Sequence, residues 1–213
     1  MTSTHGDSTA LSSVPTAPVQ QNRVLAFSLI ILGAIGFVAA FALTLDKFAL
    51  LENPNADLGC NFSLLVGCST NLNSAQGEVL GFPNSLLGIV FWTVTLTIGF
   101  ALLAGAHLAR WFWALFALAT AGSLALVVWF VGQSLFVLHV LCPWCMVTWA
   151  VTIPTFFVVI LHAVRSGVTP GSPAVGAFAQ KAFAWIPLAT LVSYLIIAVL
   201  AQWKLDVITA LFG

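Results

Sequence analysis

Five long apolar runs limit what this chain can fold into. They cover residues 24–45, 86–106, 111–138, 143–163 and 183–203, and none of them contains Asp, Glu, Lys or Arg. Each run has the roughly 20 residues that a helix needs to cross the ~30 Å hydrocarbon core of a bilayer. Only 6% of the chain is charged, whereas about a quarter of a soluble domain is. The pattern predicts an all-α membrane protein with five transmembrane helices.

The first 22 residues differ from these runs in composition. They are rich in Ser, Thr and Pro and show no apolar periodicity, so they cannot bury enough surface to offset the entropy lost on ordering. We expect residues 1–22 to form a disordered tail. A cleavable signal peptide is the alternative for residues 1–45, but the apolar core of such a peptide usually has ~7 to 15 residues. The run 24–45 is long enough to remain in the membrane.

Basic residues predict the orientation, because Lys and Arg in short loops are retained in the cytoplasm. When the spans alternate, the side of the N-terminus holds Arg23, Arg110, Arg165 and Lys181, and the other side holds Lys47 and Lys204. We therefore expect a multi-pass protein of the cell (inner) membrane, in contact with lipid, whose N-terminus is cytoplasmic. All four cysteines then lie on the outer side, where disulfides persist. The zero net charge argues against a nucleic-acid partner.

Two of the cysteines, Cys142 and Cys145, form a C-x-x-C motif at the start of the fourth run. Pro143 suits the first position of a helix, because the N–H group that a proline lacks would have no partner there anyway. Both thiols would then lie on about the same face of the first turn. The positive end of the helix dipole lowers the pKa of a nearby thiol, so the motif indicates a reactive dithiol. The alternative is a structural disulfide or two small buried residues.

The other two cysteines, Cys60 and Cys68, lie in the loop 46–85, which is far longer than usual connections and is therefore predicted to be functional or disordered. Structural zinc sites favour two to four residues between paired cysteines, whereas C-x7-C is the spacing here, so we expect no metal. Electrons pass between thiol pairs through mixed disulfides. A loop pair that reaches both a soluble partner and the helix pair would form a relay.

Taken together, these motifs resemble the bacterial branch of the vitamin K epoxide reductase family. The resemblance covers residues 24–164 and depends on the two cysteine pairs and on the sequence FPNSLLG at residues 82–88. It implies a membrane thiol:quinone oxidoreductase, an enzyme that reoxidises an extracytoplasmic DsbA or thioredoxin-like protein and supports disulfide bond formation. Electrons would pass from that protein to the loop pair, then to the helix pair, and then to menaquinone or ubiquinone in the membrane.

The resemblance also implies roles for single residues. Cys145 would face the quinone, and Cys142 would exchange with Cys60 and Cys68. Asn84 would donate a hydrogen bond to a quinone carbonyl. The alternative for Asn84 is a cap of the second helix, which would contribute about 1 kcal/mol of stability.

A quinone site also needs a flat apolar slot with one or two polar contacts. We expect Trp144 and Trp149, which flank the thiols, to line this slot, with Phe91 as a further candidate. Vertebrate relatives have a tyrosine at the position of Trp149. The tryptophan removes a hydroxyl donor, which argues against epoxide reduction.

The catalytic unit of the family is a bundle of four helices around the quinone. Here it would comprise residues 23–165, with the loop 46–85 on its outer side. A cytoplasmic loop at 166–182 would lead to a fifth, peripheral transmembrane helix and a short outer tail within 183–213. Many bacterial relatives carry a thioredoxin-like domain after the fifth helix, whereas this chain stops at Gly213. We therefore expect the redox partner to be a separate protein.

Two other functions fit part of the pattern. A DsbB-type oxidase would carry its quinone-proximal C-x-x-C in the first outer loop, which is the reverse of the order found here. A non-catalytic membrane scaffold with two structural disulfides would keep both pairs oxidised. The state of the thiols separates the scaffold from a relay, because relay pairs exchange with a reduced protein partner.

Overall fold

A computed structural model of the chain describes residues 17–63, 65–166 and 181–212. Five of its helices are long and apolar enough to cross a membrane, namely Arg23–Glu52, Asn84–Leu103, Arg110–Leu138, Pro143–Arg165 and Phe183–Leu205. The only strand-like pairing in the described residues is an isolated bridge between Val66 and Leu141. The predicted all-α membrane protein is therefore confirmed.

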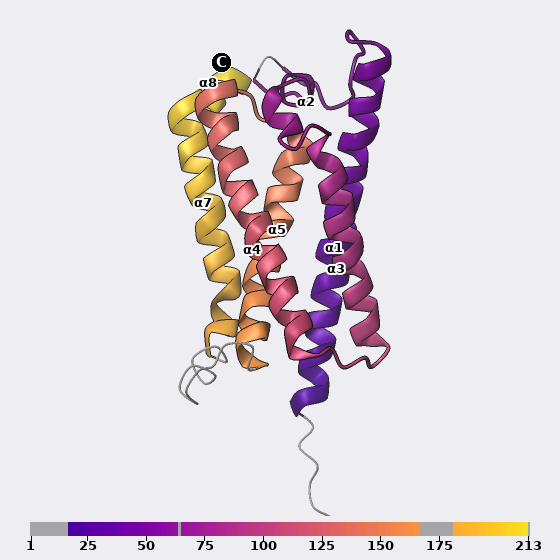
Figure 1. The fold of residues 1–213 in the computed structure, drawn as a ribbon. Helices are drawn as coiled ribbons and strands as arrows, with labels where there is room; N and C mark the ends of the chain where they lie inside the picture. The colour runs from indigo at the N-terminus through magenta and orange to yellow at the C-terminus, as the bar shows by residue number, and fades with distance from the viewer. Residues whose placement is uncertain (1–16, 64, 167–180, 213) are drawn as a thin grey trace, which may run out of the picture.

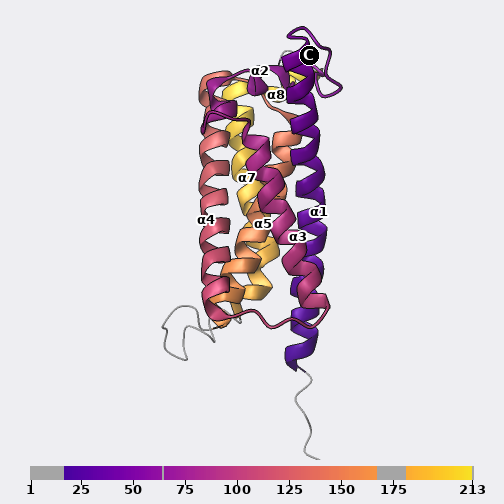
Figure 2. The ribbon, with the colours of Figure 1, turned by 45° about the vertical axis from the view of Figure 1, so that its right-hand side comes forward.

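The helices run up and down in sequence order (Figure 1). The long ones are α1 (Ala17–Glu52), α3 (Asn84–Leu103), α4 (Arg110–Gln133), α5 (Pro143–Arg165) and α7 (Ile186–Leu205). Shorter ones are α2 (Ser69–Leu72), η1 (Ala75–Glu78), the π-helical turn η2 (Ser134–Leu138), η3 (Phe183–Trp185) and α8 (Val207–Phe212). Figures 1 and 2 show α2 and α8 at the same end of the molecule, opposite to the start of α1.

Four of the long helices form the bundle, and the fifth lies outside it. Helix α1 packs against α3 and α5, and α4 packs against α5, whereas α7 contacts α5 and η2. Only 6% of the most apolar window of the last span is buried, against 22% or more in each of the other four. The fifth helix is therefore peripheral, as predicted.

Small residues let α1 and α3 approach each other closely. A Cβ atom added at Gly36 would overlap the indole ring of Trp92, and one added at Gly99 would lie 2.7 Å from Ile30 Cγ1. Close backbone approach at small residues is the usual way in which membrane helices gain packing contacts. The contact fixes the height of α3 against α1, and the first turn of α3 carries residues of the site described below.

The main apolar core lies away from the cysteines, towards the end of the bundle where α1 begins. Its buried members come from the first part of α1, the end of α3, the start of α4, the end of α5 and the start of α7: Leu25, Leu29, Ile98, Trp113, Phe116, Val158, Val159 and Ile186. The buried polar residues Lys47, Asn71 and Ser134 lie near the other end. Apolar packing therefore stabilises the bundle at one end, and the cysteines lie at the other end.

The bounds of α1 differ from those expected. The helix begins at Ala17, inside the expected tail 1–22, and continues to Glu52, beyond the expected start of the loop at residue 46. Residues 1–16, and residues 167–180 of the expected cytoplasmic loop, lie outside the described residues. The predicted span ended at the first charged residues, Asp46 and Lys47. In the structure, however, Lys47 is buried and paired with Glu78 at 2.8 Å. An ion pair makes such a position tolerable inside a helix bundle.

Candidate active site

The cysteines of the long loop form a disulfide, and the amide side chain of Asn61 closes the turn between them. Cys60 and Cys68 are bonded, with their Cα atoms 5.8 Å apart. Asn61 Oδ1 accepts hydrogen bonds from the backbone N–H groups of Cys68 and Ser69, at 2.9 and 3.3 Å, and Asn61 Nδ2 donates to Ser69 Oγ at 2.7 Å. The side chain of Asn61 thus closes the turn that brings the two cysteines together.

Backbone pairing docks this loop onto the segment that precedes α5. Gly67 N–H donates to the carbonyl of Leu141 at 3.0 Å, and Leu141 N–H donates to the carbonyl of Leu65 at 2.8 Å. The pairing places Cys68 beside Cys142, with their Sγ atoms 3.6 Å apart. Both side chains are fully buried. The loop disulfide and the helix thiol are therefore in direct contact.

The C-x-x-C motif lies at the start of α5, as the sequence predicted. The helix begins at Pro143, and Cys142 is its N-cap, whose Sγ accepts a hydrogen bond from the backbone N–H of Cys145 at 3.4 Å. A hydrogen bond from the Cys145 side chain lowers the pKa of Cys142, and the N–H groups of Cys145 and Trp144 lower it further, which outweighs the effect of burial. Cys142 is thus the thiol prepared to act as a thiolate.

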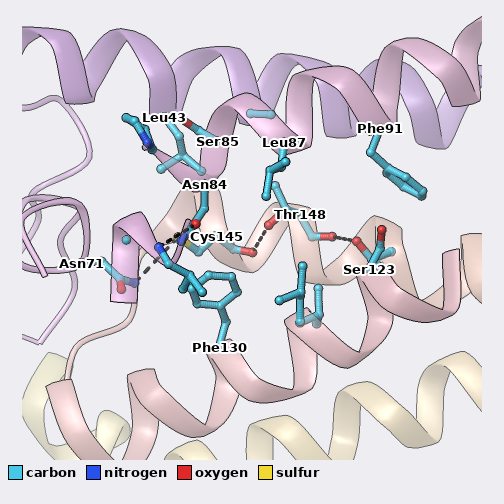
Figure 3. Close-up of a pocket in the computed structure, with 18 of the residues that line it drawn as sticks. Leu43, Asn71, Asn84, Ser85, Leu87, Phe91, Ser123, Phe130, Cys145 and Thr148 are labelled. Atoms are coloured by element: carbon cyan, nitrogen blue, oxygen red, sulfur yellow. Dashed lines mark hydrogen bonds between the residues drawn. The ribbon is translucent and has the colours of Figure 1, made fainter. Parts of the chain in front are cut away.

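Cys145 faces a different space from Cys142. It lines a cavity of about 330 Å³ between α1, α3, α4 and α5, whereas Cys142 does not. Figure 3 shows Asn84 and Cys145 close together at one end of this cavity and Phe91 further along α3. The volume is within the range of small-molecule sites, which are mostly apolar with a few polar groups. One thiol of the pair contacts the loop, and the other contacts a pocket.

The predicted binding residues divide between this cavity and its surroundings. Asn84, Phe91 and Trp149 line it. Trp144 does not. It packs instead against the cluster around Leu43, Cys60 and Cys142, because it follows Pro143 on the face of α5 that turns towards the loop. Trp144 is close to both thiols in the sequence, so its position did not indicate whether it would face the cavity or the loop.

Asn84 does not cap its own helix. The N-cap of α3 is Pro83. Asn84 Nδ2 instead donates to the carbonyl of Gln76 at 2.6 Å, and its Oδ1 accepts from Val79 N–H at 3.1 Å. Asn84 therefore ties the η1 segment to α3, and among the residues that the structure describes its amide nitrogen donates only this one hydrogen bond.

Sequence reasoning missed several polar residues that also line the cavity, among them Lys47 and Asn71. Lys47 is 6% exposed, and its Nζ donates to the carbonyl of Leu72 at 2.8 Å in addition to its ion pair with Glu78. Asn71 Nδ2 lies 3.8 Å from Cys145 Sγ, as the dashed line in Figure 3 marks. The sequence did hold a signal for Lys47, which is one of two charges directly after an otherwise charge-free run. Nothing in the pattern distinguished Asn71 from other loop residues.

A carboxylate lies beside the loop disulfide. An Asp46 oxygen and the sulfurs of Cys60 and Cys68 all lie within 4.8 Å of one another. Only a thiolate is a good metal ligand, and these two sulfurs are bonded to each other. In this oxidised state the group is therefore a disulfide with an acidic neighbour.

The chain matches a known protein family. The model of the vitamin K epoxide reductase family matches residues 27–160, which span α1 to α5 and include both cysteine pairs and Asn84. No curated protein matches the chain.

Proposed function

Because the chain belongs to the vitamin K epoxide reductase family, we propose that it is a thiol:quinone oxidoreductase that reoxidises a separate DsbA or thioredoxin-like protein. Family membership and five apolar helices make it a multi-pass membrane oxidoreductase of disulfides. The observation that carries the proposal is the 3.6 Å contact between Cys68 Sγ and Cys142 Sγ. It joins an oxidised pair to a reduced pair, and a scaffold with two structural disulfides has no use for such a contact.

The two pairs can exchange electrons in two balanced steps. In the reduced loop, the Cys68 thiolate attacks Cys142 of the oxidised helix pair, so that a Cys68–Cys142 bond forms and Cys145 leaves as a thiolate. Cys60 then attacks Cys68, the loop disulfide forms again, and Cys142 leaves as a thiolate. The two electrons of the loop dithiol have moved to the helix pair. The structure has the bonding pattern that follows this transfer, with Cys60 and Cys68 bonded and both helix thiols free.

The lowered pKa of Cys142 favours this direction. A thiol of low pKa is a good leaving group in thiol–disulfide exchange. The hydrogen bonds at the start of α5 lower the pKa of Cys142 and so stabilise it as it leaves Cys68. Cys145, at the cavity, then holds the electrons where an acceptor can reach them.

The cavity has the composition that a quinone ring requires. Its walls are mostly apolar and include Phe91 and Trp149, and two of its polar residues, Asn71 and Asn84, lie near Cys145. In the described part of the chain, Lys47 Nζ uses two of its three possible hydrogen bonds and Asn84 Nδ2 uses one of two. A quinone such as menaquinone or ubiquinone accepts two electrons and two protons. Donors aimed at its oxygens would stabilise the negative charge that develops there.

We further propose that the cysteines face the outside of the cell (inner) membrane. Arg110 begins α4 and Arg165 ends α5, at the end of the molecule where α1 also begins (Figure 1). Basic residues favour the cytoplasmic side. Maleimide should then label Asn55→Cys, but not Ala109→Cys, from outside intact cells. Labelling of Ala109→Cys from outside would reverse the orientation.

The central experiment is quinone reduction by the purified chain. It should reduce ubiquinone-1 or menadione when supplied with a reduced DsbA-like protein, at a rate that depends on the chain's concentration. A chain with all four cysteines replaced by Ser is the control for direct reaction between the partner and the quinone. If the two chains give the same rate with every quinone tested, the enzymatic proposal is wrong.

A further inference from the structure

Asp46 lies against the loop disulfide, and nothing in the relay so far uses it. Its Oδ2 is 3.3 Å from Cys60 Sγ, at the outer end of α1. Among the described residues it forms no ion pair, in contrast to the adjacent Lys47, which pairs with Glu78. In the described part of the chain, its close polar neighbours are the sulfurs of Cys60 and Cys68, whose bonding changes during the proposed reaction.

In the oxidised state, the contact between Asp46 and Cys60 contributes no hydrogen bond. A sulfur in a disulfide has no hydrogen to donate, and a half-buried carboxylate beside it gains no hydrogen bond. When the loop pair is reduced, Cys60 carries an S–H group at hydrogen-bond distance from the carboxylate. The placement of Asp46 is therefore suited to the reduced loop and to the steps that interconvert the two states.

We propose that Asp46 is the general base that takes the proton from Cys60 as the loop pair passes its electrons to the helix pair. The proposal rests on the relay described above and adds a catalytic residue to it. Only a thiolate attacks a disulfide. In the second step of the relay Cys60 must therefore lose its proton before it attacks Cys68.

The atoms and electrons of this step balance. The Cys60 proton moves to Asp46 Oδ2, the Cys60–Cys68 bond forms, the Cys68–Cys142 bond breaks, and Cys142 keeps the electron pair as a thiolate. Asp46 is partly exposed, so its proton can pass to water on the outer side. In the reverse direction, protonated Asp46 would return this proton to Cys60 as it leaves.

The surroundings leave Asp46 free for this role. The titratable groups near it are Cys60 and Cys68 of the loop and Cys142 at the start of α5, whose pKa Asp46 raises slightly by charge repulsion. Lys47, next in sequence, is engaged with Leu72 and Glu78. No described cation holds the carboxylate away from the sulfur.

The size of the effect follows from the ionisation of a thiol. An ordinary thiol of pKa about 8.5 is about 3% ionised at pH 7, so full deprotonation by a base can accelerate attack by at most about 30-fold. The advantage should shrink as the pH approaches 9, because the thiol then ionises without help. A base therefore predicts a large effect near neutral pH and a small one in alkali.

The experiment follows the Cys68–Cys142 mixed disulfide in a single turnover without quinone. The purified, fully oxidised chain is mixed with a reduced DsbA-like protein and quenched in acid, and the intermediate is quantified by alkylation, non-reducing proteolysis and mass spectrometry. In Asp46→Asn the intermediate should decay about 10- to 30-fold more slowly at pH 7 than in the unchanged chain, and the gap should close towards pH 9. Asp46→Glu should restore most of the rate. Glu52→Gln, which removes an exposed charge from the same end of α1, should decay normally.

Other results would overturn the proposal. Normal decay in Asp46→Asn would exclude a base, and equal slowing in Asp46→Asn and Asp46→Glu, or a gap that persists at pH 9, would indicate a role in folding of the loop. Because quinone is absent, failure of the chain to reduce quinone would leave these results unchanged. If the unchanged chain forms no Cys68–Cys142 intermediate, the relay is wrong, and the role of Asp46 with it.

Discussion

Cys142 and Cys145 are positioned by one turn of helix, whereas Cys60 and Cys68 are positioned by contacts between segments far apart in the sequence. The helix pair needs only Pro143 and the N–H groups at the start of α5. The loop pair depends on the Asn61 side chain and on backbone pairing with Leu141. The loop segment that follows is held by Lys47 to α1 and by Asn84 to α3.

This difference indicates how the two pairs divide the work. A helix start keeps its geometry through many turnovers, because its hydrogen bonds are local. A loop held by a few separate contacts can move when a protein partner approaches, and such segments belong to the less stable parts of a structure. The fixed pair suits a buried acceptor, and the loop pair suits an exchange with a large soluble partner.

The largest expected effect comes from removing one cysteine of each pair. Cys68→Ala should abolish quinone reduction driven by a DsbA-like protein, because the partner then has no route to Cys142. The same variant should retain quinone reduction driven by dithiothreitol, which can reduce the helix pair directly. Cys145→Ala should lose both activities. These rates can be measured with ubiquinone-1 as the acceptor.

The proposed division of work between the two cysteine pairs is wrong if the DsbA-like protein and dithiothreitol give the same result in each variant. Equal loss of both activities in Cys68→Ala would show that the loop pair does more than carry electrons. Full activity of Cys145→Ala with either reductant would remove Cys145 from the quinone end of the path.

Substitution of Asn84 tests whether this residue acts on the quinone in the cavity or only anchors the loop. A donor to a developing oxyanion in a preorganised site contributes ~10²- to 10³-fold in rate, so Asn84→Asp should reduce kcat/KM for quinone by about that factor. The same change also weakens the tie to Gln76. Ser74→Ala is the matched control, because Ser74 caps η1 and lies outside the cavity lining.

The two variants separate binding from anchoring. If Asn84 acts on the quinone, Ser74→Ala should keep near-normal quinone kinetics, while both variants lower thermal stability by amounts typical of a lost cap, about 1 kcal/mol. Equal losses of kcat/KM in both variants would mean that Asn84 acts only by holding the turn.

Much of the fold could be predicted from the sequence, because its signals are local. The spans follow from apolar runs without charge, and the start of α5 follows from Pro143 within the C-x-x-C motif. The end of α1 could not be predicted, because Lys47 is accommodated by Glu78, a residue that reaches it only after the loop docks. The place of Trp144 and the contact of Asn71 with Cys145 also depend on tertiary packing, which a single sequence does not reveal.

A smaller effect is expected from the ion pair that holds the loop to α1. Its side chains are unequally exposed, 8% for Lys47 and 40% for Glu78. Glu78→Gln leaves a buried cation with only the Leu72 carbonyl and should cost about 1 to 3 kcal/mol of stability. Lys47→Met leaves a carboxylate that water can reach and should cost less, about 1 kcal/mol or below. Thermal unfolding followed by tryptophan fluorescence in detergent checks the order, and a greater cost for Lys47→Met would contradict it.

The smallest effect concerns the helix pair, where the pKa of Cys142 should respond to its neighbour. The Cys145 side chain is the largest cause of the lowered pKa, and the N–H groups of Cys145 and Trp144 also contribute. A lowered pKa means that the thiolate persists to lower pH, so loss of the side-chain donor should move the midpoint of ionisation up, towards that of an ordinary thiol. In Cys145→Ala the rise should be only partial, because the N–H groups remain. In Cys145→Ser a hydroxyl donor replaces the thiol, so the rise should be smaller still. Both variants also carry Cys60→Ala and Cys68→Ala, because a free Cys142 would otherwise exchange with the loop disulfide. Only Cys142 then titrates as a thiol, and its thiolate absorbance at 240 nm measures both midpoints. If the midpoint of Cys145→Ala lies no higher than that of Cys145→Ser, the side chain of Cys145 does not set the ionisation of Cys142, and the backbone of the first turn acts alone.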